Sequence, residues 1–239
     1  MEVLPWIKDD SKLPWVILWD VTQRDWLQSL PWWNYWQKNE RWVLAGKQAE
    51  LWIHHLELWF PAMINDPEYD AVKHTADSIW EMDSVVFWLA RLVESDVSNA
   101  ISAIQWAKHK WIHTFVGTSK EHLSTFSFST DEMLQNIISR VEQIRNAWCI
   151  AQFSAEDATR TDLDLLVEVY EKALKAWAQI LNIPDTLWYY DVEQYLKLLQ
   201  HLKENFPYAI MSVHTHNDKA QAEQNALVAA SNWFVQKIE

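Results

Sequence analysis

Glycine is almost missing from this chain, which has 2 glycines in 239 residues. A soluble domain of this length ordinarily contains about 17, because glycine makes up roughly 7% of average sequences. Nearly all the residues that favour a positive φ angle are therefore absent. The chain carries 18 tryptophans. These are either aromatic additions to a core or occupants of positions where glycine is expected.

Other features are also scarce, and each excludes a class of protein. The single cysteine, Cys149, excludes an intramolecular disulfide framework and fits a reducing compartment. No apolar run approaches the roughly 18 residues of a membrane span. Residues 1–11 are acidic and lack a basic segment followed by an apolar one, so no secretory signal is expected. We expect a cytoplasmic protein without membrane contact.

Positive charge is in deficit, since 20 Lys and Arg residues stand against 33 Asp and Glu residues, for a formal net charge of −13. A surface of this sign repels a phosphate backbone, so nucleic acid is not expected as a partner. Apolar residues make up 49% of the chain and charged residues 22%. This composition is typical of one soluble globular domain with a sizeable core.

Short aliphatic runs alternate with longer amphipathic stretches along the chain. The runs predict strands at 16–20, 53–58, 84–89, 111–116, 149–153, 179–183, 210–214 and 234–238. The stretches between them predict helices at 38–51, 67–79, 95–108, 130–147, 161–176, 191–205 and 219–232. In the fifth stretch, apolar residues recur at three- and four-residue steps, as in a helix with one buried face.

Strand–helix–strand units at this spacing favour parallel pairing with right-handed crossovers. Eight of them predict an α/β fold of the (β/α)8 TIM barrel type in a single domain. We place this barrel, as the catalytic domain, at 16–239, ending at about the eighth strand, after an N-terminal cap or lead-in at 1–15. An open doubly wound sheet is the alternative, but no glycine-rich phosphate loop follows any predicted strand.

Polar residues cluster where several predicted strands end, which is the active-site end of a barrel. His214 and His216 end the seventh strand, followed by Asn217 and Asp218. Residues two apart on a strand project to the same side, so the two imidazoles can share a divalent cation if a carboxylate completes the set. A surface histidine pair remains an equal alternative.

The first strand runs into Arg24 and Asp25. An arginine beside a metal-bound carboxylate suits polarising a substrate carbonyl and stabilising the oxyanion that develops from it. An ordinary surface ion pair is the alternative. Three later strands also end in polar clusters, at 113–119, 153–157 and 182–186.

Seven motifs in chain order resemble those of the catalytic barrel of the 2-isopropylmalate synthase family, over nearly the whole chain from Val16 onward. They are Asp20-x-Thr22-x-Arg24-Asp25-x-x-Gln28, Leu56-Glu57-x-x-Phe60-Pro61, Leu89-Ala90-Arg91, Ile112-His113-Thr114-Phe115-x-x-Thr118-Ser119-x-x-His122, Phe153-Ser154-x-Glu156-Asp157-Ala158-x-Arg160-Thr161, Asn182-x-Pro184-Asp185-Thr186 and His214-x-His216-Asn217-Asp218. Each motif is weak evidence by itself. In register, they are specific for the wider superfamily of metal-dependent aldolases and lyases.

The resemblance implies an acyltransferase that condenses acetyl-CoA with the 2-oxo acid 2-oxoisovalerate in a Claisen-type step of leucine biosynthesis. It implies that Asp25, His214 and His216 hold a divalent metal (Mg²⁺, Mn²⁺ or Zn²⁺) that acts as Lewis acid, and that Arg24 lies over the ketone oxygen. A homodimer is compatible with the resemblance.

The resemblance further assigns Glu156 to catalysis and a second group of residues to substrate binding or to orienting the site. That group is His113, Ser154, Asn182 and Thr186. For His113, a purely structural hydrogen-bonding role is an equal alternative. The remaining histidines to which no role is given are interpreted as surface or helix-flank residues: His54, His55, His74, His109 and His201.

Alternative functions stay open at this point. A homocitrate synthase, a citramalate synthase or a hydroxymethylglutaryl-CoA lyase shares the same site chemistry and differs in the pocket walls. A barrel scaffold without activity is the alternative from another class. The family's loop after the eighth strand and its following subdomains lie beyond Glu239, so we expect residues 1–239 to bind metal weakly and to turn over negligibly.

Several tryptophans stand where the resembled family has glycine. Trp26, Trp59, Trp88 and Trp188 do so inside motifs, and Trp52, Trp148, Trp177 and Trp233 do so at helix-to-strand junctions. Glycine there usually adopts the left-handed conformation, which costs a bulky residue about 1–2 kcal/mol. Gly46, by contrast, interrupts a predicted helix. This pattern favours an engineered or altered natural sequence, although Trp15, Trp19 and Trp111 fit ordinary core positions.

Overall fold

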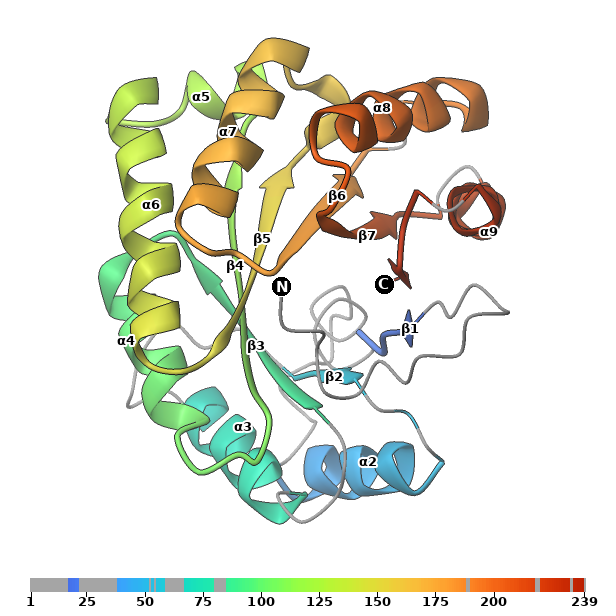
Figure 1. Cartoon of the computed structure of the whole chain (residues 1–239). Coiled ribbons are helices and arrows are strands. Elements are labelled where there is room, and N and C mark those ends of the chain that lie inside the picture. Colours follow the sequence, from blue (N-terminus) through green and yellow to red (C-terminus); the bar gives the residue numbers. More distant parts are fainter. Residues whose placement is uncertain are drawn as a thin grey trace.

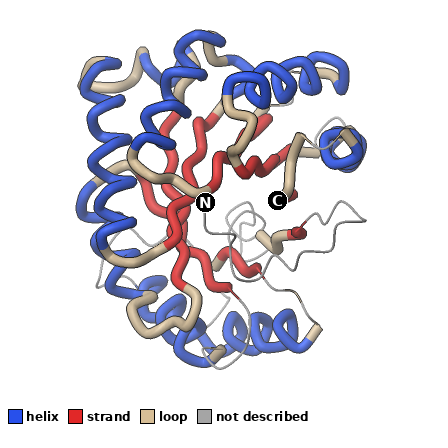
Figure 2. Tube along the Cα trace, in the orientation of Figure 1, coloured by secondary structure: helices blue, strands red, loops and turns tan. Residues whose placement is uncertain are grey.

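The computed structural model describes residues 17–21, 38–51, 53, 55–58, 67–79, 85–187, 190–217, 220–232 and 234–238. Parallel strands form one curled sheet, and the helices cover its outer face (Figure 1). Figure 2 shows the same two layers, with the strands inside and the helices outside. The strand order of this eight-stranded sheet is β1-β8-β7-β6-β5-β4-β3-β2.

All of the predicted strands are confirmed, each within three residues of its expected bounds. The strands are β1 (Ile17–Leu18), β2 (His55–Glu57), β3 (Val85–Arg91), β4 (Lys110–Gly117), β5 (Ile150–Glu156), β6 (Ile180–Asp185), β7 (Ile210–Thr215) and β8 (Lys237–Ile238). Most of the predicted runs are rich in aliphatic or β-branched residues, as expected for parallel strands that are covered on both faces.

The predicted helices are also confirmed. They are α2 (Lys38–Glu50), α3 (Pro67–Ser78), α4 (Glu94–Ala103), α6 (Thr130–Asn146), α7 (Leu163–Lys175), α8 (Val192–Asn205) and α9 (Ala222–Ser231). Helix α4 ends five residues before its expected end, because the chain turns at Ile104 and Ala107 N donates to Ile104 O. Two short elements were not predicted, namely α5 (Lys120–Leu123) and the 3₁₀ helix η3 (Ala158–Arg160). Within the described residues, no helix is long and apolar enough to cross a membrane.

The segment after β1 lies beside β2, at the other end of the strand order. Asp20 forms an isolated parallel bridge with Leu56. Its N–H donates to His55 O at 3.0 Å, and its carbonyl accepts from Glu57 N at 2.9 Å. The curled sheet therefore brings its first and second strands to the same place.

Each helix packs against the sheet through one buried face. In α7 the buried residues are Leu166, Val169, Tyr170 and Ala173, which confirms the predicted apolar stripe. The Tyr170 hydroxyl donates to Asn182 O at 2.7 Å, so α7 is fixed to the adjacent strand β6. From α8, the Tyr195 hydroxyl donates to Ile183 O at 2.6 Å.

Helices α6 and α7 both end with a tryptophan in the left-handed conformation. Trp148 has φ 60° and Trp177 has φ 71°. After α6, Cys149 N donates to Ile144 O and Trp148 N to Arg145 O, and the same two bonds recur one helix later between 177–178 and 173–174. This pair of bonds is the Schellman motif, whose left-handed position ordinarily holds glycine. The prediction that these two tryptophans occupy glycine-type positions is confirmed.

An aromatic cluster fills the inner face of the sheet at the amino ends of the strands. Trp19, Phe87 and Trp111 are buried there, which confirms the core interpretation of the two tryptophans. The Lys237 ammonium lies 3.6 Å from the Trp111 ring centroid and 4.6 Å from that of Trp19, within the range of cation–π attraction. His55 is also buried, at 2% exposure, with its ring 5.5 Å from that of Trp111.

The expectation that His55 is a surface or helix-flank residue is therefore wrong. The strand predicted at 53–58 includes His55, so the sequence itself favoured a strand position for this residue. The paired strand places His55 beside Val85, on a fully covered sheet. Of the other histidines given no role, His74 on α3 is exposed, whereas His109 after α4 and His201 on α8 are partly buried; His54 lies outside the described residues.

Candidate active site

A chain of buried polar side chains crosses the inner face of the sheet from β2 to β6. Glu57 Oε1 lies 2.9 Å from His113 Nδ1, and His113 Nε2 lies 2.6 Å from Ser154 Oγ. The amide of Asn182 donates to the same Ser154 oxygen at 2.9 Å. All four side chains are almost fully buried. Three residues predicted from the sequence for substrate binding therefore lie together in one network.

The strand period explains where this network lies. Trp111 is on the inner face at the amino end of β4, and His113 follows two residues later on the same face. Ser154 and then Glu156 continue the inner face of β5 in the same way. The inner face thus changes from aromatic at the amino ends of the strands to polar toward their carboxyl ends.

The two histidines after Val213 converge at the carboxyl end of β7. His214 Nε2 and His216 Nε2 are 3.2 Å apart, and their rings are nearly perpendicular. His214 is 8% exposed. The two Nε2 atoms lie within hydrogen-bond distance of each other. Paired imidazoles are also the ligand type that zinc and the transition metals prefer.

A complete ligand set is not visible in the described part of the chain. No group of three or more His, Cys, Asp or Glu side chains there is arranged to hold a metal ion. Asp25, the expected third ligand, and Arg24 lie outside the described residues. Both assignments stay predictions.

A second polar cluster surrounds the carboxyl ends of β4 and β5. Glu156 ends β5 and lies one-third exposed, with Oε1 4.0 Å from His122 Nε2. The next residue, Asp157, is fully buried and has φ 65°. Its carboxylate accepts from Arg160 Nε at 3.0 Å and lies 3.6 Å from His122 Nδ1.

The pKa of Asp157 lies below its ordinary value. Burial alone would raise it, and this is the largest single influence. The hydrogen bonds from Arg160 and Ser119, together with the positive charge of Arg160, outweigh burial and lower it. Asp157 is therefore a carboxylate at neutral pH, and it anchors the groups around it.

Thr186, also predicted as a substrate-binding residue, joins this second cluster and not the first. Its hydroxyl oxygen accepts from Asp157 N at 3.1 Å. Asp185, the residue before it, accepts from Thr159 Oγ1 at 2.8 Å. These bonds tie the end of β6 to the turn after β5.

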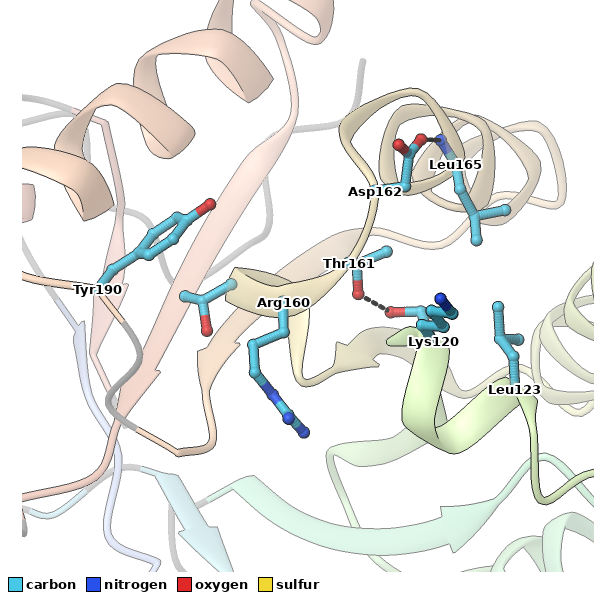
Figure 3. Close-up of a pocket in the computed structure, with 9 residues that line it drawn as sticks. Lys120, Leu123, Arg160, Thr161, Asp162, Leu165 and Tyr190 are labelled. Carbon is cyan, nitrogen blue, oxygen red and sulfur yellow. Dashed lines mark hydrogen bonds between the residues drawn. The ribbon is translucent and has the colours of Figure 1, made fainter.

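A groove of about 530 Å³ opens beside this cluster, between α5 and the start of α7. Figure 3 shows Lys120 and Leu123 of α5 across from Asp162 and Leu165. Thr159 and Arg160 of this cluster line the groove, whereas none of the predicted site residues that the structure describes does so.

Several residues of these clusters received no role from the sequence, Glu57 and His122 among them. Glu57 lies in a quoted motif, and its burial on a three-residue strand could not be read from so short a run. His122 also ends a quoted motif, on the unpredicted helix α5. Gly117 was the signal available in the sequence, since it is one of only two glycines. In the structure, a Cβ atom at this position would lie 2.4 Å from His122 Cγ.

Comparison with known proteins shows the family of this chain. Residues 15–236 match the family model described as HMGL-like. The chain belongs to the HMGL-like family. It is 34% identical over 225 residues to 2-isopropylmalate synthase 1 of Caldanaerobacter subterraneus subsp. tengcongensis, covering 92% of this chain and 55% of that protein. It is 35% identical to 2-isopropylmalate synthase of Bacillus thuringiensis, covering 92% of this chain and 44% of that one.

The chain thus spans about half the length of the curated relatives it matches. Among solved structures, the HMG-CoA lyase of Bacillus subtilis superposes with a TM-score of 0.75 at 15% identity, covering 95% of this chain and 76% of the lyase. At that identity the likeness shows a shared fold. The sequence comparisons therefore show the family of the chain, and the solved structure agrees with its fold.

Proposed function

We propose that this HMGL-like chain carries the catalytic core of an acyltransferase of the 2-isopropylmalate synthase type, which condenses acetyl-CoA with 2-oxoisovalerate. The observation that carries the proposal is the convergence of His214 Nε2 and His216 Nε2 to 3.2 Å at the carboxyl end of β7. The relatives at 34% and 35% identity bear the name of that enzyme.

The proposed scaffold is a complete (β/α)8 barrel over 16–239, with a lead-in at 1–15. The pairing of β1 with β8 and the bridge from Asp20 to Leu56 support closure of the sheet. In a barrel of this kind the carboxyl ends of the strands form the active site. His214, Glu156 and Thr186 all lie at that end of their strands.

We propose a divalent cation, Mg²⁺, Mn²⁺ or Zn²⁺, held by His214, His216 and Asp25. The two described ligands fit such an ion, since both present Nε2 to the same point. When bound, the ion supplies Lewis acidity to the ketone of a chelating 2-oxo acid. The carboxylate of Asp25 would complete the set.

The remaining residues would act on the substrate directly. Arg24 would lie over the ketone oxygen and stabilise the alkoxide that develops there. Glu156, one-third exposed at the rim, would contact substrate as a catalytic group. Below it, the network of His113, Ser154 and Asn182 presents fixed donors and acceptors that orient the substrate without reorganisation.

Binding of Mn²⁺ by calorimetry tests the proposal, with and without 2-oxoisovalerate. We expect one Mn²⁺ site per chain that is lost in His214→Ala and retained in His74→Ala, a matched change on the exposed face of α3. Tighter binding of 2-oxoisovalerate in the presence of Mn²⁺ is the second expected result. Absence of any divalent site would overturn the proposal in favour of a scaffold without activity.

Substrate profiling separates the related enzymes. Homocitrate and citramalate synthases, and hydroxymethylglutaryl-CoA lyase, would share the metal-binding histidines and differ in the acyl pocket. We expect 2-oxoisovalerate to bind more tightly than 2-oxoglutarate or pyruvate. We also propose a cytoplasmic location and assembly as a homodimer, with neither nucleic acid nor membrane as a partner.

A further inference from the structure

The imidazole of His122 is fixed in place by its surroundings at the carboxyl ends of β4 and β5. Its ring packs directly on Gly117, where an added Cβ would lie 2.4 Å from Cγ and 2.6 Å from Cδ2. The φ angle of Gly117 is not positive, so glycine is needed there for space and not for backbone conformation. Only a residue without a side chain admits the ring.

Hydrogen bonding then orients the fixed ring. Ser119 Oγ lies 2.9 Å from His122 Nδ1. The same hydroxyl also bonds to the carboxylate of Asp157, which can only accept. Ser119 therefore donates to Asp157 and accepts from Nδ1–H of His122. Nε2 of His122 then faces Glu156 Oε1 at 4.0 Å, an ion-pair separation longer than a hydrogen bond. Because a carboxylate only accepts, this contact is attractive when Nε2 also carries a proton.

Charged side chains lie around the His122 imidazole. Asp157 Oδ2 lies 3.6 Å from Nδ1 and is fully buried. Arg160 pairs with Asp157 and also lies 3.6 Å from Glu121 Oε2, so its charge is shared between two acids. His122 and Glu156 are each 34% exposed, so both face the space above the strand ends.

We propose that His122 is a positioning residue for Glu156, held by Gly117, Ser119 and Asp157 so that its Nε2 aims the Glu156 carboxylate at the substrate. The proposal rests on the proposed function only in naming that substrate. The orientation of the carboxylate by His122 is a property of the fold and is measurable without turnover.

Nuclear magnetic resonance tests the orientation. Protein labelled with ¹³C in glutamate and ¹⁵N in histidine reports the Glu156 carboxyl shift and the His122 tautomer. We expect a proton on Nε2 of His122 as well as on Nδ1 in the native protein. His122→Phe keeps a ring on Gly117 and removes both nitrogens, so the Glu156 carboxyl signal should move. His74→Phe is the matched control and should leave that signal unchanged.

Gly117→Ala provides an independent variant, because it displaces His122 without deleting any functional group. We expect it to move the Glu156 signal in the same direction as His122→Phe, whereas Ser119→Ala should change the His122 nitrogen signals. A Glu156 signal that stays unchanged in folded Gly117→Ala and His122→Phe proteins overturns the proposal. Thermal melts identify the folded variants.

Ligand binding connects the positioning to function. We expect His122→Phe to weaken binding of 2-oxoisovalerate by about 10- to 100-fold, as loss of an outer-shell partner typically does, while Mn²⁺ affinity stays unchanged. If the unaltered chain binds no 2-oxo acid, the proposed function fails and the resonance data still decide the role of His122. If binding is equal in both proteins, His122 does not position Glu156 for the substrate.

A different observation carries a second inference, about the tryptophans at left-handed positions. Trp148 and Trp177 are 89% and 75% exposed, so their indoles gain little from packing at positions that disfavour any side chain. The long bond of the same motif recurs from Ile53 N to Gln48 O and from Phe234 N to Ala229 O. The residues just before Ile53 and Phe234 are tryptophans that lie outside the described residues.

The buried Trp88 supports the same inference about lost glycines. Trp88 is fully buried in β3, and within the described residues its indole N–H has no acceptor. An unpaired buried donor costs about 1–3 kcal/mol. Selection for aromatic packing accounts for neither the exposed nor the unpaired indoles. A uniform replacement of glycine accounts for both, together with the count of 18 tryptophans against 2 glycines.

We propose that the positions of Trp148 and Trp177 are decoded as glycine in the cell that makes this protein. The codon UGA, which some translation systems read as tryptophan, differs from the glycine codon GGA only in its first base. A cell that reads UGA as glycine would place glycine wherever the fold requires it. The sequence would then be natural and not engineered.

Mass spectrometry of the protein isolated from its source cells tests this proposal. Trypsin releases peptide 146–160, which contains position 148, and peptide 176–197, which contains position 177. We expect glycine at both positions. Tryptophan in either peptide overturns the proposal for this chain, and the same protein made with tryptophan in a standard host supplies the reference spectra.

Discussion

At the scale of single residues, the left-handed tryptophans and the buried Asp157 are the positions where backbone conformation matters most. Trp148, Asp157 and Trp177 all have φ between 60° and 71°. An aspartate side chain tolerates this region because it can hydrogen-bond locally, whereas a tryptophan side chain makes no such compensating bond. Identical backbone geometry therefore stabilises the site in one case and is strained in the other two.

Trp148→Gly and Trp177→Gly should each stabilise the protein by about 1 kcal/mol. Relief of left-handed strain, about 1–2 kcal/mol, exceeds the entropy that an added glycine costs, about 0.5–1 kcal/mol. Trp106→Gly is the matched control, since Trp106 is 69% exposed without a positive φ. Urea unfolding should show gains for the first two changes and a loss for the third.

Asp157→Asn should destabilise the protein at neutral pH by about 1–3 kcal/mol, because a buried charged partner of Arg160 is lost. Asparagine accepts the same φ, so the change isolates the charge. The folded pKa of Asp157 is lowered, so its contribution to stability is present above the unfolded pKa and is lost as pH falls through the folded pKa. Unfolding curves of the two proteins should therefore converge in acid.

At the scale of elements, the sequence predicts helices and strands with a clear hydrophobic pattern and misses the short helices. Helix α7 was visible from its apolar stripe, and β4 from its aliphatic run. Helix α5 has four residues and η3 has three, too few to show any period. Since α5 supplies His122, the least predictable element carries a central residue of the second cluster.

Gly46→Ala should stabilise helix α2 by about 0.5–1 kcal/mol, the difference in helix propensity between the two residues. No atom lies within 4 Å of the Cβ that alanine would add, so no clash offsets the gain. Gly117→Ala is the opposite case and should destabilise. Thermal unfolding monitored by circular dichroism distinguishes the two, and a loss of stability in Gly46→Ala would contradict the assignment.

At the scale of the whole molecule, the bridge between Asp20 and Leu56 joins the two ends of the strand order. Asp20→Pro removes the N–H that donates to His55 O and should destabilise the fold by about 3 kcal/mol. Val192→Pro is the control, because the first position of helix α8 tolerates proline. Equal stabilities of the two variants would mean that this bridge contributes little.

The sequence predicts part of the candidate site. The roles of His113, Ser154 and Asn182 came from motif resemblance, and the fold shows that these residues form one network. The strand order determines that network, since β4, β5 and β6 are adjacent. Glu57 joins it from β2 across the inner face, a contact between side chains on non-adjacent strands that no linear pattern encodes.

The strained turns and the reactive groups lie at opposite ends of the strands. Trp148 and Trp177 precede β5 and β6, whereas Glu156 and Thr186 lie at or just beyond the carboxyl ends of those strands. The length of a strand thus separates each strained turn from the candidate site. Replacing Trp148 or Trp177 should therefore change the stability of the chain at a distance from Glu156 and Thr186.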